Sequence, residues 1–119
     1  MSHDDSRLPR PLDRNLAAAV AATMQALATP SRLLILDRLR TSPLPVGELA
    51  EAVGMEQSAV SHQLRLLRHL GLVTGEPRGR QVIYTLYDPH VGDLLDEAVG
   101  HIEHLRQAGR SVEVLAEAS

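Results

Sequence analysis

A change in the spacing of apolar residues constrains the fold of this chain more than any other feature. Two short segments with helical spacing, each followed by a glycine, precede two shorter segments in which every second residue is apolar. In order, they are Val46–Val53, Gln57–Leu70, Leu72–Gly75 and Gln81–Leu86, and the last two flank the turn residues 76–80. Two short helices joined by a tight turn and followed by a hairpin are typical of a winged helix-turn-helix. The sequence therefore predicts a mainly α fold with a small β-hairpin.

Amphipathic segments on both sides of this motif predict three further helices. The first begins near Asn15 and ends before Pro30, which begins the second, and Asp88 and Pro89 are an N-cap and first-turn proline for the last. Their apolar stripes are Leu16, Val20, Met24 and Leu27, then Leu33, Leu34, Ile35, Leu36 and Leu39, and finally Val91, Leu94, Leu95, Ala98, Ile102 and Leu105. Residues 42–45, with two prolines, read as a turn. We expect one domain over residues 15–107, a mobile arm over 1–14 and a frayed tail over 108–119.

Several classes of function are excluded by what the sequence lacks. It contains no cysteine, so disulfides, thiol nucleophiles and cysteine-rich zinc sites are absent. No apolar run approaches the ~20 residues that span a bilayer. The first thirty residues lack the basic and apolar blocks of a signal peptide, so we expect a cytoplasmic protein that does not enter a membrane. With no glycine-rich phosphate loop and no nucleophile–base pair, we expect no enzyme, including one that hydrolyses through a metal-activated water.

The charges are distributed unevenly, although the net charge is only −3. Residues 61–87 contain four arginines and one acid, whereas residues 88–119 contain two arginines and seven acids. In Gln57–Leu70, the apolar positions Val60, Leu64 and Leu67, with Gly71 after the helix, have helical spacing and are expected to face the domain. Hydroxyl, histidine and arginine side chains form the opposite stripe. Such side chains suit base edges and phosphates in the major groove of double-stranded DNA.

The predicted DNA contacts lie in that helix and in the hairpin that follows it. A solvated helix face is the alternative, but two mid-helix serines are weak helix formers and need another reason to be there. The candidates are Gln57, Ser58, Ser61, His62, Arg65 and Arg68 in the helix, with Arg78 and Arg80 in the hairpin.

Three motifs resemble, in the same order, segments of the ArsR/SmtB family of bacterial metal-sensing repressors. Residues 55–73 are similar to the family's recognition segment, residues 28–36 to the start of its second helix and residues 79–86 to its wing. The resemblance covers about residues 15–107. It implies a homodimer, with the first and last helices at the interface, that binds a double-stranded DNA operator.

The resemblance also implies a metal site on the last helix. Other members of the family bind metal through a cysteine pair on the first helix of the helix-turn-helix. The matching stretch here, Gly47–Glu51, has no cysteine, so the arsenic, cadmium and lead branches are excluded. The residues that match the last-helix site are Asp88, His90, His101 and His104. The second pair consists of two histidines, His101 and His104, and a further histidine, His3, lies near the N-terminus beside the Ser2 amine. This set of ligands is similar to that of the family's nickel/cobalt-sensing branch. Together these nitrogen and oxygen donors would raise the coordination number toward six, which suits Ni(II) or Co(II). Zn(II), which prefers four tetrahedral ligands, is the runner-up.

The spacing of these ligands predicts where the metal sits. His90 and His101 share a helix face but are separated by ~16 Å along the axis, at about 1.5 Å per residue. Ligands lie within ~2 Å of their ion, so one chain cannot complete a site. Two antiparallel helices across a dimer would bring Asp88 and His90 to the partner's His101 and the partner's His104.

Each ligand also has a simpler interpretation. His101 and His104 are also consistent with solvated positions on the helix surface. His104 is consistent with a favourable interaction with the dipole at the helix C-terminus, and Asp88 is consistent with an N-cap that has no other role. His62 and His69 are assigned to the DNA side and to a helix cap. The main alternative function is therefore a winged-helix regulator controlled by a partner protein, with a weak or vestigial metal site.

Overall fold

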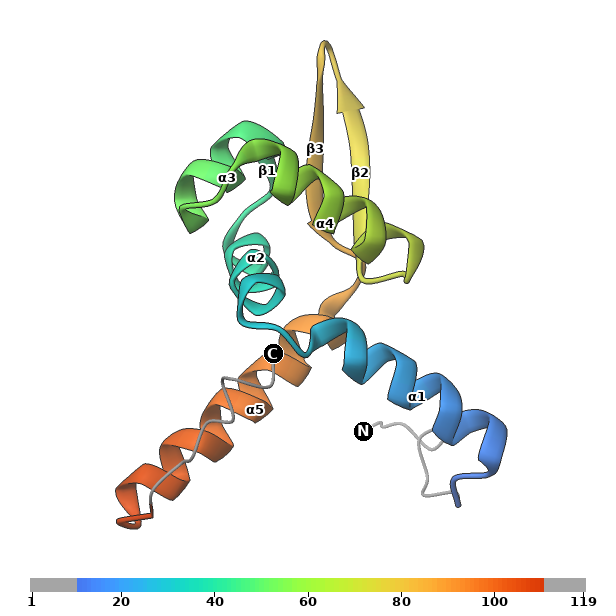
Figure 1. Cartoon of the computed structure of the whole chain (residues 1–119), viewed down its shortest axis with the longest axis vertical. Helices are drawn as coiled ribbons and strands as arrows, with labels where there is room; N and C mark the ends of the chain where they lie inside the picture. Colours follow the sequence, from blue (N-terminus) through green and yellow to red (C-terminus); the bar gives the residue numbers. More distant parts are fainter. Residues whose placement is uncertain (1–10, 111–119) are drawn as a thin grey trace, which may run out of the picture.

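The computed structural model describes residues 11–110, which form five helices and three short strands (Figure 1). In chain order they are α1 (Arg14–Leu27), α2 (Pro30–Thr41), β1 (Leu44–Pro45), α3 (Val46–Val53), α4 (Gln57–His69), β2 (Val73–Arg78), β3 (Gln81–Leu86) and α5 (Pro89–Gln107). The strands form one antiparallel sheet in the order β1-β3-β2. The predicted winged helix-turn-helix is confirmed. Most of the expected arm (1–14) and tail (108–119) lies outside the described residues.

Helices α1 and α2 begin at side-chain caps that the sequence analysis did not identify. Asp13 Oδ1 accepts a hydrogen bond from the Leu16 amide at 2.7 Å, and Thr29 Oγ1 accepts one from the Arg32 amide at 3.2 Å. Pro30 and Pro89 occupy first-turn positions, where no backbone donor is needed. The caps satisfy amides that a helix start leaves without partners. The predicted starts, near Asn15, at Pro30 and at Pro89, agree with the observed ones to within a residue.

A glycine sets the angle between α3 and α4. Gly54 has φ 71° and ψ 37°, a left-handed conformation that ends α3, and its amide bonds back to carbonyls of the last turn. The Met55 amide donates to the Ala50 carbonyl at 3.0 Å, which closes the turn. The chain then enters α4 after two residues, as a helix-turn-helix requires.

The core lies between α2, α3, α4 and the sheet. Its most deeply buried side chains are Ile35, Leu36, Leu49, Val60, Leu64, Leu67 and Val73. The apolar stripe predicted for α4 is therefore confirmed, because all three of its helical members are fully enclosed. Ala26 and Leu27 of α1, and Val91 and Leu95 of α5, complete the core from either side.

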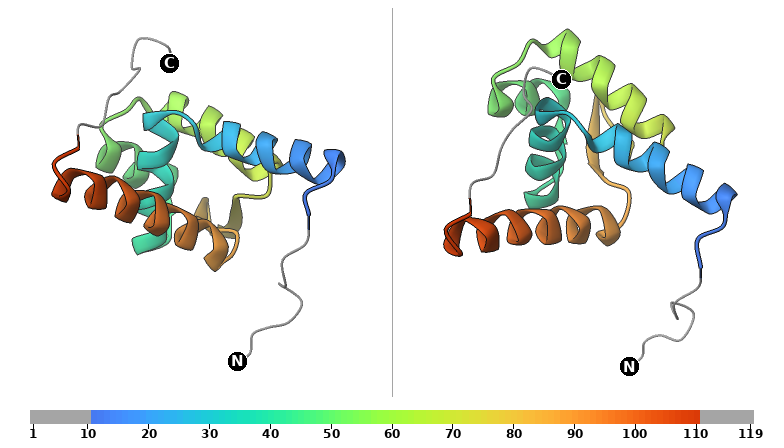
Figure 2. Two further views of the ribbon diagram at one scale, coloured as in Figure 1. Left: turned by 90° about the horizontal axis from the view of Figure 1, so that it is seen from below. Right: turned by 60° about the horizontal axis from the view of Figure 1, so that its bottom comes forward.

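The predicted apolar stripes of α1, α2 and α5 are all buried only in part. In α1, Leu27 is buried, whereas the other three members of the stripe are exposed. In α2, Leu33 and Leu34 are 39% and 54% exposed, because four consecutive residues of a helix cannot all face one side. In α5, burial ends at Leu95, beyond which Ala98 is exposed and Ile102 half-buried. Figures 1 and 2 show the reason: α1 and α5 extend beyond the body at the end opposite the hairpin, and they diverge.

The sheet corrects two expectations. Residues 42–45 were expected to be a turn, but Leu44 and Pro45 form β1 and pair with Tyr84 and Ile83 of β3. A two-residue strand contains too little alternation to be recognised in a sequence. The hairpin turn is also shorter than expected, because residues 76–78 belong to β2 and only Gly79 (φ 62°) and Arg80 connect the strands. Pro77 is tolerated there because β2 is an edge strand.

Among residues 11–110, no single helix is long and apolar enough to cross a membrane. Only α1 and α2 together meet that length and composition, and they are bent by 89° at the break between them.

Truncation of the α4 stripe tests this core. Leu64→Ala should lower the free energy of unfolding by about 2–5 kcal/mol, because a fully buried leucine leaves a cavity. Urea denaturation at fixed protein concentration measures the change. Leu12→Ala is the control: this leucine is 63% exposed, and its truncation should change stability by less than ~0.5 kcal/mol. Equal losses in the two variants would contradict the described core.

Candidate nucleic-acid interface and metal-binding helix

Burial of one side of α4 presents its polar side to solvent. With Val60, Leu64 and Leu67 enclosed, the opposite stripe is exposed along the whole helix. Of the six candidates on α4, Ser61 is half-buried and the others, Gln57, Ser58, His62, Arg65 and Arg68, are exposed. The helix thus offers hydroxyl, amide, imidazole and guanidinium groups on one convex surface, which is what a major groove can accept.

The hairpin brings two more arginines to the same end of the molecule. Arg78 ends β2 and Arg80 lies in the turn, at the tip that projects beyond α3 and α4 (Figure 1). Arg78 Nη2 lies 3.9 Å from Glu76 Oε1, with side chains 69% and 73% exposed, so this pair is weak and leaves the cation available. Both arginines are exposed.

Gly75 of β2 leaves room for side chains of the neighbouring strand β3 and for Arg68 of α4. A Cβ atom at this position would come within 2.9 Å of Val82 Cγ1 and 3.0 Å of Tyr84 Cε1, and 3.4 Å from Arg68 Nη1. Because there is no side chain, the Arg68 guanidinium reaches β2 from α4. A glycine within a strand pattern was the sequence signal for such an approach.

Shallow hollows show which candidates lie together. One, of about 390 Å³, is bounded by Gln57 at the start of α4 and by Arg80 in the hairpin turn, with Gly47 and Tyr84 between them. A second, of about 320 Å³, is bounded by His62, Arg65, Leu66 and His69 along α4 itself. The first hollow therefore joins the start of α4 to the hairpin turn, and the second lies on α4 alone.

The metal candidates on α5 are only partly brought together. Asp88 caps the helix: its Oδ1 accepts from the His90 amide at 3.0 Å, and its Oδ2 lies 3.3 Å from His90 Nδ1. The His90 side chain is 85% exposed and that of Asp88 is 35% exposed. One carboxylate and one imidazole are thus adjacent and accessible at the start of α5.

His101 and His104 lie near the opposite end of the same helix, where both are exposed. Within residues 11–110, no group of three or more histidine, aspartate or glutamate side chains is close enough to hold an ion. The four candidates therefore form two separate pairs, at the two ends of α5. His3 lies outside the described residues.

Two polar links that the sequence did not predict connect α2 to its neighbours. Arg32 Nε donates to Gln63 Oε1 of α4 at 2.8 Å, and its Nη1 donates to the Ala26 carbonyl of α1 at 3.2 Å. At the other end of α2, Arg40 pairs with Asp96 of α5. These pairs are 31 and 56 residues apart in sequence, and neither belongs to a local motif, so one sequence offers no signal for them.

The chain has clear relatives. A family model described as "Bacterial regulatory protein, arsR family" matches residues 29–74. The HTH-type transcriptional regulator NmtR of Mycobacterium tuberculosis is 66% identical over 100 residues, which are 84% of this chain and 83% of that protein. The solution structure of apo-NmtR has a TM-score of 0.70 at 63% identity and covers 88% of each chain.

Two further solved structures are similar. The crystal structure of AntR, an antimony-specific transcriptional repressor, has a TM-score of 0.74 at 33% identity and covers 90% of this chain and 98% of that one. The homodimeric winged helix-turn-helix DNA-binding domain of a Mycobacterium bovis protein has a TM-score of 0.70 at 28% identity, covering 90% and 100%.

Two substitutions separate the cap from any other role of Asp88. Asp88→Ala removes the acceptor for the His90 amide and should cost about 0.5–2 kcal/mol of stability. Asp88→Asn keeps a side-chain oxygen and should lose far less. Thermal denaturation in the presence of a chelator measures both, and equal destabilisation by the two variants would show that the hydrogen bond is not what holds the start of α5.

Proposed function

Because this chain belongs to the ArsR/SmtB family of bacterial transcriptional regulators, in the branch represented by NmtR, we propose that it is a homodimeric, metal-responsive DNA-binding regulator. It binds a double-stranded operator through α4 and the hairpin, and a divalent metal held between the two α5 helices changes that affinity. The observation that supports this most is the placement of two candidate ligand pairs, Asp88 with His90 and His101 with His104, at opposite ends of α5. Within residues 11–110, no group of three such side chains lies together, so each pair needs further ligands to hold an ion.

Family membership also answers the question of enzymatic activity. The relatives are transcriptional regulators and not enzymes, as the sequence predicted. We place the protein in the cytoplasm, where a bacterial regulator meets its operator.

DNA contact is proposed for the six α4 residues and for Arg78 and Arg80. In support, the apolar stripe of α4 is buried and its polar stripe is exposed beside the hairpin arginines. In a winged helix-turn-helix the second helix of the motif enters the major groove, so α4 would read base edges. The hairpin arginines would contact phosphates, which fix the protein's position on the duplex.

A second copy of the chain is proposed to cover the exposed apolar surface of α1, α2 and α5. Leu16, Val20 and Met24 of α1 are 37%, 38% and 49% exposed, and Val99 of α5 is 48% exposed. Beside them, a groove of about 680 Å³ runs between α2 and α5. Its lining combines apolar residues, among them Leu33, Leu34, Ala98 and Ile102, with the charged residues Asp37, Arg40, Glu103 and Arg106. Apolar surface this extensive on a small domain marks an interface. Residues 15–107 would then be both the DNA-binding and the dimerisation domain.

The metal is proposed to bind at two symmetry-related sites in that dimer. Asp88 and His90 of one chain would meet the partner's His101 and the partner's His104, because antiparallel α5 helices bring opposite ends together. His3 is the proposed additional ligand. Nitrogen and oxygen donors favour Ni(II) or Co(II), with Zn(II) as the runner-up. Metal binding would then alter the angle between protomers and so the spacing of the two α4 helices.

Arg65 is the sharpest test of DNA reading. Arg65→Ala should weaken binding to a selected duplex by about 1–3 kcal/mol if the guanidinium contacts a base edge. The duplex is obtained by enrichment from a random library, and affinity is measured by fluorescence anisotropy at one salt concentration. Arg38→Ala, an exposed arginine of α2, is the matched control and should leave affinity unchanged. Unchanged affinity in Arg65→Ala would refute its role.

Val20→Glu tests the interface. A charge in the middle of the exposed face of α1 should shift the dimer toward monomer in sedimentation velocity, because the carboxylate would lose its water on association. Ala52→Glu adds the same charge to the exposed surface of α3 and should leave the sedimentation profile unchanged. A dimer that survives Val20→Glu would count against α1 as part of the interface.

Titration of Ni(II) by calorimetry tests the metal site. The tag-free protein should bind one ion tightly per chain, and His90→Ala/His101→Ala should abolish that binding. His69→Ala, an exposed histidine of α4, is the control and should bind as before. Weak binding, or tight binding that survives the double substitution, would favour the runner-up function, a DNA-binding regulator controlled by a partner protein.

A further inference from the structure

Helix α2 lies between the helix with the metal candidates and the helix that faces DNA. It contacts α1, α3, β3 and α5, whereas α5 packs chiefly on α2 and β3 (Figure 1). Helix α4 packs on α3 and β2. Any displacement of α5 therefore reaches the helix-turn-helix largely through α2 and the sheet.

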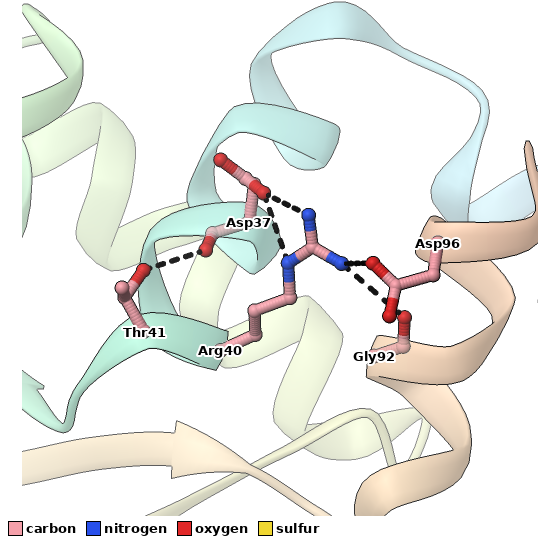
Figure 3. A network of polar contacts seen from close by, with 5 residues as sticks. All are labelled: Asp37, Arg40, Thr41, Gly92 and Asp96. Atoms are coloured by element: carbon pink, nitrogen blue, oxygen red, sulfur yellow. Dashed lines mark hydrogen bonds and ion pairs between the residues drawn. The ribbon is translucent and has the colours of Figure 1, made fainter. Parts of the chain in front are cut away.

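The C-terminal end of α2 holds α5 through Arg40 (Figure 3). Arg40 Nη1 pairs with the Asp96 carboxylate and also donates to the Gly92 carbonyl at 3.5 Å. Its Nε donates to Asp37 Oδ1 at 3.1 Å, which fixes the guanidinium plane from α2 itself. The hydrogen bond with Asp96 raises the pKa of Arg40 above its ordinary value, because the carboxylate favours the charged guanidinium.

These Arg40 contacts fall in the first two turns of α5. Gly92 follows His90 by two residues, and a Cβ atom there would lie 3.8 Å from Arg40 Cδ. The backbone next to the Asp88–His90 pair thus rests against the Arg40 side chain, which is 29% exposed. An isolated ion pair on the surface adds little to the free energy of unfolding. A guanidinium that binds both a carboxylate and a backbone carbonyl of one helix, however, restrains the rotation of that helix about its axis.

The N-terminal end of α2 holds α4 through Arg32. Arg32 Nε donates to Gln63 Oε1, and Nη1 donates to the Ala26 and Gln25 carbonyls at the end of α1, at 3.2 and 3.5 Å. Gln63 is half-buried and lies two residues before Arg65. One guanidinium therefore joins the last turn of α1 to the middle of α4.

We propose that α2 couples α5 to α4, with Arg40 and Arg32 as the positioning residues at its two ends. The two arginines are eight residues apart, ~12 Å along a continuous helix at about 1.5 Å per residue. A helix of this length moves as one body, so a change of α5 at Arg40 reaches Gln63. The inference rests on the proposed metal-responsive function.

The test compares the ratio of DNA affinities with and without Ni(II) in matched variants. Arg40→Gln and Asp96→Asn should each reduce this ratio ~2- to 30-fold, and the double variant should reduce it no further, because both remove one interaction. Arg38→Gln and Asp93→Asn change exposed neighbours that form no ion pair within residues 11–110 and should retain the ratio. Calorimetry should give wild-type Ni(II) affinity for all four single variants.

Gln63 gives a second test with a conservative rescue. Gln63→Leu removes the acceptor for Arg32 Nε and should reduce the ratio to a similar extent. Gln63→Glu keeps an acceptor and should preserve the ratio, even if its charge weakens DNA binding equally in both states. If Arg40→Gln and Gln63→Leu both keep the wild-type ratio of DNA affinities with and without Ni(II), and bind Ni(II) with wild-type affinity, the proposal is overturned.

Amide hydrogen exchange separates this proposal from the proposed function. If wild-type protein binds Ni(II) without any change in DNA affinity, the proposed function fails. In the metal-free protein, Arg40→Gln should still speed exchange both in residues 90–98 of α5 and around Gln63 of α4. Faster exchange confined to α5 would overturn the coupling through α2.

Discussion

Burial of the α4 apolar stripe is the constraint on which the rest of the structure depends. Because Val60, Leu64 and Leu67 are fully enclosed against the core, the rotation of α4 about its axis is fixed. That rotation decides that Ser58, His62 and Arg65 face outward. Gly54 sets the direction of the helix, and Gly75 leaves room on β2 for the Arg68 guanidinium, so core packing and two glycines together shape the surface proposed to meet DNA.

The same core is too small to bury everything apolar in the chain. It encloses only the last turn of α1 and the first half of α5, and the remaining apolar residues of both helices stay exposed. A second copy that covers them would place the four ligand candidates of two α5 helices across the dimer. Metal affinity, subunit geometry and the spacing of two α4 helices would then be linked, which is the condition for allosteric control.

Local signals predicted most of the fold. The first-turn proline Pro30, the Asp88 cap with Pro89, and Gly54 after α3 marked helix ends to within a residue. The caps at Asp13 and Thr29 were found only in the structure. The sequence did not predict β1, the exposure of Leu33 and Leu34, or the contacts of Arg32 and Arg40. Strand β1 and the arginine contacts depend on residues distant in sequence, which helical or alternating spacing does not encode. The exposure of Leu33 and Leu34 has a local cause, because a run of four apolar residues is too wide for one helix face.

Complementation between two defective chains tests the central claim most directly. One chain has Asp88→Ala/His90→Ala and the other has His101→Ala/His104→Ala, so neither homodimer contains a complete intersubunit site. In the mixed dimer, the intact Asp88 and His90 of one chain face the partner's His101 and the partner's His104, so one site keeps all four ligands. The other site has lost all four. The account predicts that each homodimer lacks tight Ni(II) binding and that the purified mixed dimer regains one ion. A mixed dimer without tight Ni(II) binding would contradict it.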